Sequence, residues 1–252
     1  MVFAHGFGCD QNMWRFVTPA FEADYKVVLF DYAGHGGSER PTSGARYSIL
    51  QGYTEDVLEI LAELGLKEVV FVGHSVSAVI GALASIAAPE RFSNLIMVAP
   101  SPCYINQGEY IGGFSRQQID ELLEFLDTNH LGWSSAMAPA IMGNPDRPEL
   151  TEELTASFCS TDPEVAKQFA KATFLSDNRR DLPLVTTPTL VIQCSYDIIA
   201  QQCVGEYVHA AIPNSRYALL SATGHCPHLS DPAETTASIK NYLAQAELRG
   251  AN

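Results

Sequence analysis

The stretch "VVFVGHSVSAVIG", residues 69–81, decides the fold of this 252-residue chain. Four apolar residues are followed by Gly73 and Ser75, and small apolar residues continue behind the serine. A buried strand, a sharp turn that exposes a serine and a closely packed helix have this order, which is the context of a nucleophile elbow. Taken alone, the stretch leaves two readings open for Ser75: a catalytic nucleophile, or an ordinary serine that follows a buried strand.

Ser77 departs from the usual pattern of such an elbow. Glycine normally stands two residues after the nucleophile, because the helix packs close to the strand there and a large side chain would collide. Serine is small enough for a crowded position, and its hydroxyl can bond to a backbone group in the turn. The exchange therefore weakens the motif without removing it.

Short β-branched runs alternate with amphipathic segments along the chain. Apolar runs at 2–4, 26–31, 68–73, 94–99, 189–194 and 217–222 indicate strands, mostly buried on both faces. Within residues 47–64, one helical stripe carries Ile49, Tyr53, Val57, Ile60, Leu61 and Leu64. Residues 231–243 begin with Asp-Pro, as a capped helix does. The order of strand, helix and strand predicts an α/β fold with a mostly parallel central sheet flanked by helices.

Residues 103–182 interrupt this order. They hold four stretches of helical pattern that are rich in Phe, Trp and Met and are punctuated by Pro and Gly. We expect an inserted helical lid here, between a first part of the core at 1–102 and a second part at 183–252. Aromatic residues at helical spacing are more often core than pocket, so we assign only some of them to a pocket over the site.

A base and an acid follow Ser75 in the order that this architecture requires. Asp197 lies in the turn after the strand at 189–194, and His225 lies in the loop after the strand at 217–222. Open α/β sheets build their sites at the carboxyl ends of parallel strands, where all three residues are placed. The pattern therefore predicts Ser75 as nucleophile, His225 as general acid and base, and Asp197 as the residue that orients His225.

Each partner also has a plainer reading. Asp197 could cap a helix and His225 could be a loop histidine, but their joint placement makes both of these readings weak. His228 is a rival base, and we favour His225 because it directly follows Gly224 at the strand end. We read His228 as a support of the loop.

Acyl transfer needs backbone N–H groups that face the developing oxyanion. One of them usually follows the nucleophile, and the other comes from the loop after an early strand. The segment "AHGFGCDQNMW", residues 4–14, is that loop, and its glycines let the backbone pass close to a substrate. We expect the oxyanion hole to consist of the N–H groups of Phe7 and Val76, with His5 bracing the loop.

The charge and the cysteines exclude several classes of function. A formal net charge of −14 disfavours binding to a nucleic-acid backbone or an anionic membrane. The six cysteines form no CxxC pair, and zinc at His225, Cys226 and His228 would lack a fourth ligand, so we expect no metal. Scattered cysteines fit reduced thiols, and no stretch at the start of the chain reads as an export signal. These features together indicate a cytoplasmic protein.

Nearly the whole chain resembles α/β-hydrolase-fold proteins, and most closely the bacterial RsbQ-type stress-signalling hydrolases and their plant relatives, the karrikin and strigolactone receptors. The resemblance is carried by "HGFGCDQNMW" (5–14), "FDYAGHGGS" (30–38), "FVGHSVSA" (71–78), "QFAKATFLSD" (168–177) and "GHCPHLSDP" (224–232). In that subfamily the form GHSVSA is a known nucleophile elbow, which supports Ser75 as nucleophile. The chain begins inside the strand before HGFG, whereas these relatives carry further edge strands first.

The resemblance also implies a four-helix lid over an apolar pocket and no cofactor. Phe7 and five further residues stand at positions that match pocket residues of the relatives: Phe114, Trp133, Met137, Phe174 and Ile198.

The expected function is that of a cytoplasmic serine hydrolase acting on a small apolar ester or lactone, coupled to stress signalling through a partner such as a stress-response phosphatase. One alternative is a ligand-triggered receptor with slow or incidental turnover. Another is a housekeeping carboxylesterase without a partner.

Overall fold

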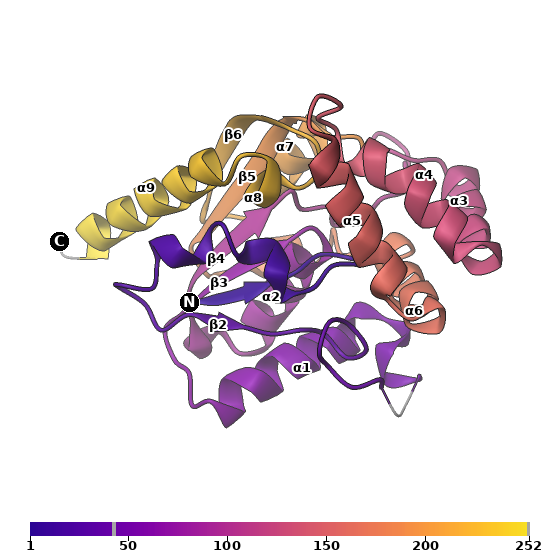
Figure 1. The fold of residues 1–252 in the computed structure, drawn as a ribbon. Helices are drawn as coiled ribbons and strands as arrows, with labels where there is room; N and C mark the ends of the chain where they lie inside the picture. The colour runs from indigo at the N-terminus through magenta and orange to yellow at the C-terminus, as the bar shows by residue number, and fades with distance from the viewer. Residues whose placement is uncertain (42–43, 251–252) are drawn as a thin grey trace.

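The computed structural model describes residues 1–41 and 44–250, and a parallel β-sheet runs through its centre (Figure 1). The six strands are β1 (Val2–Ala4), β2 (Val28–Leu29), β3 (Val69–His74), β4 (Phe92–Val98), β5 (Thr189–Tyr196) and β6 (Ser215–Thr223). They are ordered β2-β1-β3-β4-β5-β6, and every neighbouring pair is parallel. This confirms the predicted α/β-hydrolase fold class, with a sheet that is parallel throughout.

The register of the sheet places the functional loops beside one another. Ala4 at the end of β1 pairs with Gly73 near the end of β3. The loop after β1 therefore begins next to the turn after β3. All six residues of β3 are buried, because helices cover both faces of this central strand.

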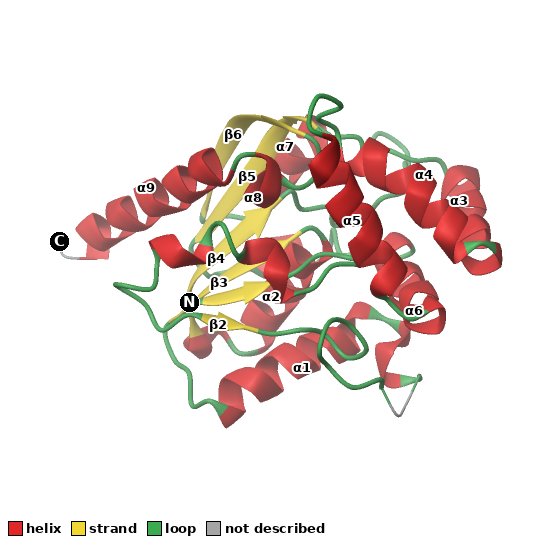
Figure 2. Cartoon of the chain, in the orientation of Figure 1, coloured by secondary structure: helices red, strands yellow, loops and turns green. Residues whose placement is uncertain are grey.

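Helices cover the two faces of the sheet (Figure 2). One face packs against α1 (Leu50–Glu63), α2 (Val76–Ala87) and α7 (Gln202–Ala211). The other face packs against α9 (Pro232–Gly250) and the segment that contains Trp14. The remaining short elements are α8 (Pro227–Ser230) and the 3-10 helices at Gln11–Trp14, Thr18–Ala20, Arg46–Ser48, Pro89–Arg91 and Leu182–Leu184.

The stripe predicted for α1 is only partly buried. Tyr53, Val57 and Leu61 are buried against the sheet, as expected. Ile49 and Leu64 are exposed, because the helix begins after Ile49 and has ended at Leu64. The predicted stripe was therefore too long by one residue at each end.

Four helices lie between β4 and β5 and sit beyond the carboxyl ends of the strands (Figure 1). These lid helices are α3 (Arg116–Thr128), α4 (His130–Met142), α5 (Pro148–Ser160) and α6 (Pro163–Phe174). Polar side chains cap the starts of two of them: Ser115 and Gln118 form a capping box at α3, and Asp162 caps α6. Their apolar sides share a cluster with core residues such as Met13 and Ile199.

Main-chain and polar contacts fix the lid helices to the core. The backbone N–H of His225 donates to the carbonyl of Ile141 in α4 at 2.8 Å. The hydroxyl of Ser157 in α5 donates to the carbonyl of Gly8 at 2.8 Å. The lid thus touches both the loop after β1 and the loop after β6.

Among the described residues, no helix has both the length and the apolar character that crossing a membrane requires.

Gly224 tests how tightly α4 docks on the loop after β6. Its φ is +84°, and an added Cβ would collide with the carbonyl oxygen of Met142 at the end of α4. Gly65 has a φ of +61° with nothing within 4 Å of such a Cβ. We expect Gly65→Ala to lower the free energy of unfolding by about 1–2 kcal/mol through backbone strain. Gly224→Ala should cost about 1–3 kcal/mol more through overpacking.

Urea unfolding of both variants measures the difference. If both variants lost the same free energy of unfolding, the end of α4 would be able to move away from the added methyl group, and its packing against this loop would be loose.

Candidate active site

Ser75 occupies a strained turn between β3 and α2. Its φ and ψ are 56° and −121°, in a region that non-glycine residues rarely adopt. The surrounding structure holds this conformation: the N–H of Ser75 donates to the carbonyl of Val98 in β4 at 2.8 Å. Gly73 has to be a glycine, because a Cβ there would collide with the carbonyl of Ser77 as the helix turns back over the strand. This is the geometry of a nucleophile elbow.

The structure brings Ser75, His225 and Asp197 together. Nε2 of His225 lies 2.8 Å from the hydroxyl oxygen of Ser75, and Nδ1 lies 2.6 Å from Oδ2 of Asp197. All three residues are buried. A neutral imidazole that donates from Nδ1 to the carboxylate has its lone pair on Nε2, where it accepts the hydroxyl proton of the serine. The arrangement is therefore able to deprotonate Ser75.

Backbone groups fix the two partners of Ser75. Oδ1 of Asp197 accepts the N–H groups of Ile199 and Ala200 at 2.8 and 3.2 Å, which leaves Oδ2 for His225. The capping role considered for Asp197 is not that of a helix N-cap, since α7 begins several residues later with Gln201 as its cap. His225 is held through its main chain, because its carbonyl accepts from Nε2 of His74 at 2.8 Å.

His228, the rival base, lies away from the serine. Its ring packs on Trp14 with centroids 4.6 Å apart and on His74 at 4.4 Å. Burial lowers the pKa of His228 to about 3, so its imidazole stays neutral. Neither ring nitrogen has a hydrogen-bond partner among the described residues. The base that faces Ser75 is His225.

The two residues predicted to supply the oxyanion hole lie in the loop after β1 and at the start of α2, and the role of their N–H groups stays a prediction. Val76 is the first residue of α2, so its N–H has no partner within the helix. Phe7 lines the same cavity as Ser75. His5 braces the loop as expected: Nδ1 donates to the carbonyl of Gly6 at 2.9 Å, and Nε2 accepts the N–H of Tyr32 at 3.2 Å. Burial lowers the pKa of His5 to about 4 and keeps it in this neutral form.

Ser77, which stands where glycine is usual, joins the elbow to this loop. Its hydroxyl donates to the carbonyl of His5 and lies 3.0 Å from the Tyr32 hydroxyl. Since the single proton of Ser77 is used on His5, the Tyr32 hydroxyl is the donor in the second bond. The sequence predicted a bond to the turn backbone. The actual acceptor is at the start of the loop after β1, 72 residues away in the sequence.

An apolar cavity opens over Ser75. Its volume is about 390 Å³. Its lining comprises Phe7, Cys9, His74, Ser75, Tyr104, Ile141, Leu154, Phe158, Thr173, Phe174, Ile199, His225 and Cys226. The lining contains no lysine, arginine, aspartate or glutamate. The cavity is therefore suited to a small uncharged ligand.

Two of the six residues predicted for the pocket line this cavity, namely Phe7 and Phe174. The other four, Phe114, Trp133, Met137 and Ile198, belong to the apolar cluster around it. Trp133 meets Phe7 edge-on at 5.8 Å. Within α4, only the last turn approaches Ser75. Ile141 of this turn therefore lines the cavity, whereas Met137 and Trp133, one and two turns earlier, do not.

Tyr104 is a lining residue that sequence reasoning missed. It follows β4 in a loop without regular structure, and it packs against Phe174 with ring centroids 5.0 Å apart. Burial raises the pKa of Tyr104 to about 12, which the nearby Ser75 hydroxyl partly opposes. Its position at the carboxyl end of a parallel strand was the available signal.

Comparisons with known proteins agree with this geometry. A family model described as "Alpha/beta hydrolase family" matches residues 1–239. A probable esterase of Oryza sativa subsp. japonica is 40% identical over 92% of this chain and 86% of its own length. The karrikin insensitive 2 receptor CA of Petunia hybrida is 39% identical over 92% of this chain and 87% of its own.

The solved structure of a hydrolase from Oleispira antarctica is similar to this structure, with a TM-score of 0.93. Its sequence is 46% identical, and the comparison covers 96% of this chain and 90% of the Oleispira chain. A strigolactone esterase of Arabidopsis thaliana is a further relative by sequence, 36% identical over 95% of this chain and 90% of its own.

Ser77→Ala tests the bond between the elbow and the loop after β1. It leaves the buried carbonyl of His5 and the hydroxyl of Tyr32 without this partner, so we expect a loss of about 1–3 kcal/mol in the free energy of unfolding. Ser85→Ala is the matched control, because Ser85 is a buried serine of α2 whose hydroxyl bonds only to Ala82 within the helix.

Chemical denaturation measures both variants. A Ser77→Ala loss no larger than that of Ser85→Ala would show that the hydroxyl of Ser77 contributes nothing beyond an ordinary helix serine.

Proposed function

The chain belongs to the alpha/beta hydrolase family, and from that premise we propose that it is a serine hydrolase that cleaves a small apolar ester or lactone. The observation that carries the proposal is the hydrogen-bonded series Ser75–His225–Asp197, with contacts of 2.8 and 2.6 Å in a buried site. Residues 103–182 act as the lid over this site.

The reaction begins when His225 takes the hydroxyl proton of Ser75 as the serine oxygen attacks the ester carbonyl. The carbonyl oxygen becomes an oxyanion that accepts from the N–H groups of Phe7 and Val76. His225 returns the proton to the leaving alcohol as the C–O bond breaks, and an acyl-enzyme remains on Ser75. Water, deprotonated by the same imidazole, then releases the acid. Asp197 stabilises the imidazolium that forms in each half.

The cavity supports the substrate class. Its lining is apolar apart from a few hydroxyls, two thiols and the imidazoles of His74 and His225, and it contains no lysine, arginine, aspartate or glutamate. An anionic or cationic substrate would lose its hydration without gaining a partner of opposite charge. The relatives named as an esterase and as a strigolactone esterase fit an ester or lactone.

A receptor function is the second candidate, and the similarity to karrikin insensitive 2 receptors favours it. Here the ligand, processed slowly or only bound, shifts the lid helices, and a signalling protein such as a stress-response phosphatase recognises the changed lid. We also place the protein in the cytoplasm, because all six cysteines are free thiols.

A fluorophosphonate probe tests the proposed nucleophile. We expect one adduct per chain, located on Ser75 by mass spectrometry of the digested protein, because this hydroxyl faces a histidine that the carboxylate of Asp197 orients. Ser101→Ala is the matched control: Ser101 is another buried serine, whose hydroxyl donates to the carbonyl of Cys103. Labelling should persist in that variant and vanish in Ser75→Ala.

An adduct that persists in Ser75→Ala would contradict the assignment. The same variant separates the two candidate functions. A receptor that acts by occupancy alone keeps its ligand-dependent signal in Ser75→Ala cells, whereas a signal that requires hydrolysis is lost.

The size of the cavity predicts selectivity for short acyl groups. We expect kcat/KM to fall by at least about 100-fold from 4-nitrophenyl acetate to 4-nitrophenyl decanoate, because the longer acyl chain has to displace packed lid side chains. This fall corresponds to an increase of about 3 kcal/mol in the activation free energy. Leu154→Ala, which enlarges the lining, should reduce this ratio. Leu123→Ala, which truncates a lid leucine away from the lining, should leave it unchanged.

Steady-state kinetics on the two esters give the ratio. A wild-type enzyme that turns over both esters equally would refute the closed cavity.

A further inference from the structure

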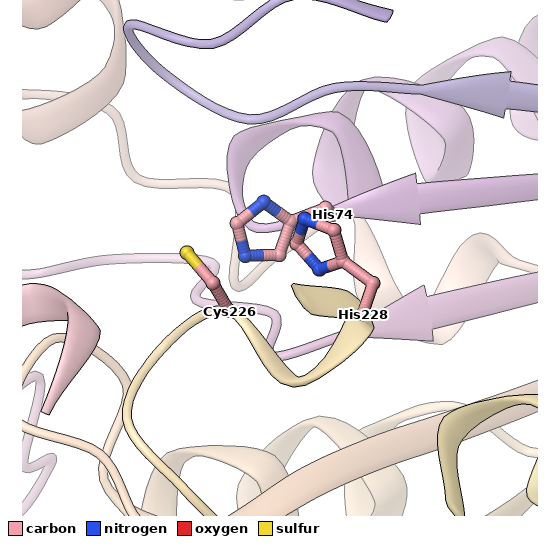
Figure 3. Close-up of side chains that lie close together, drawn as sticks. All are labelled: His74, Cys226 and His228. Carbon is pink, nitrogen blue, oxygen red and sulfur yellow. The ribbon is translucent and has the colours of Figure 1, made fainter. Parts of the chain in front are cut away.

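A cluster of three soft-metal ligands lies directly behind the serine. His74 is the last residue of β3 (Figure 3). Cys226 immediately precedes α8, and His228 lies within α8. One possible ligand atom from each residue lies within 4.8 Å of the others. All three side chains are buried, and the close-up shows them lying close together.

The two histidines have unused nitrogens. Both ring nitrogens of His228 and Nδ1 of His74 lack a hydrogen-bond partner among the described residues. Unpaired polar atoms in a protein interior are costly, and each of them calls for a physical reason. Trp14 packs against His228 and fixes the orientation of its ring, so these nitrogens do not turn toward solvent. A bound group would supply the missing partner.

The hydrogen bond of His74 leaves one of its nitrogens available to a metal. A carbonyl oxygen only accepts, so the nitrogen of His74 that faces the carbonyl of His225 carries a proton. The single proton of His74 lies on Nε2, which donates it to the carbonyl of His225. Metal-binding histidines commonly use their second nitrogen in this way.

We propose that His74, Cys226 and His228 form a three-coordinate binding site for Cu(I). A thiolate and two imidazoles are the ligands that a soft monovalent copper ion prefers. On binding, the S–H bond of Cys226 breaks, a Cu–S bond forms, and the proton leaves to solvent. No oxidation or reduction is involved.

Charge selects Cu(I) over Zn²⁺ at this position. One thiolate neutralises Cu(I), so the occupied site has no net charge in its buried surroundings. Zn²⁺ would leave one uncompensated positive charge there, which is expensive to bury, and it would need a fourth ligand. Among the described residues, no fourth histidine, cysteine or carboxylate joins the cluster.

The site requires a small closing movement and has an entry route. Metal–ligand bonds of about 2.0–2.3 Å put ligand atoms roughly 3.5 Å apart, so the separations of up to 4.8 Å must shorten by about 1 Å. Cys226 and His74 both line the cavity over Ser75, which gives the ion a path. His225 lies next to Cys226 and accepts from His74, so the occupied site would adjoin the triad directly.

X-ray absorption spectroscopy of the wild-type protein loaded with Cu(I) under anaerobic, reducing conditions tests the ligand set. We expect one copper per chain, with one sulfur and two nitrogen neighbours. Two sulfur neighbours would overturn the proposal, because they would place the ion between Cys226 and another cysteine such as Cys9, which lines the same cavity.

Competition with the chelator bicinchoninate measures the affinity of variants. Mutation of residues that only support the ligands of a metal site weakens metal binding by about 10–100-fold. Removal of a direct ligand costs more, so Cys226→Ser or His228→Gln should weaken Cu(I) binding by at least about 100-fold. Cys9→Ser is the matched control and should keep the wild-type affinity. Circular dichroism and thermal melting verify that each variant is folded.

Wild-type affinity no tighter than that of the two ligand variants would refute the site, as would tight binding of Zn²⁺ with weak binding of Cu(I).

Discussion

The hydrogen bond between His225 and Ser75 joins residues 150 positions apart, and the rest of the fold keeps its two ends in place. One end is a strained turn that the N–H bond to Val98 holds against its own conformational preference. The other end lies in a loop whose backbone is tied to α4 and to His74. A parallel sheet makes this meeting possible, because the carboxyl ends of all its strands gather at one edge.

Three buried imidazoles besides His225 support the active site. Burial lowers the pKa values of His5, His74 and His228, so none of these rings carries a charge near neutral pH. The hydrogen bonds of His5 and His74 are therefore directional contacts to backbone groups and not ion pairs. The carboxylate of Asp197 lies against His225, the ring that gains a proton during the reaction.

Local sequence order was sufficient for the sheet and for the positions of Ser75, Asp197 and His225, because each follows an apolar run that ends at the same edge. It was insufficient for side-chain contacts between loops, helices and strands that are distant in the sequence. The bond from Ser77 to His5, the proximity of His74 to Cys226, and the choice of Ile141 over Trp133 as a lining residue depend on how helices settle against strands. Periodicity identifies an apolar helix face, but several faces of the lid helices are apolar, and packing alone selects the one over the serine.

The bond from the His225 N–H to the carbonyl of Ile141 has a consequence for how such enzymes diversify. It uses main-chain atoms on both sides, so it is indifferent to side-chain identity in the last turn of α4. Mutation can change the side chains of the chamber over the serine while the scaffold of the base stays intact. A lid grafted from another protein would work here only if it delivers a carbonyl to the same point in space.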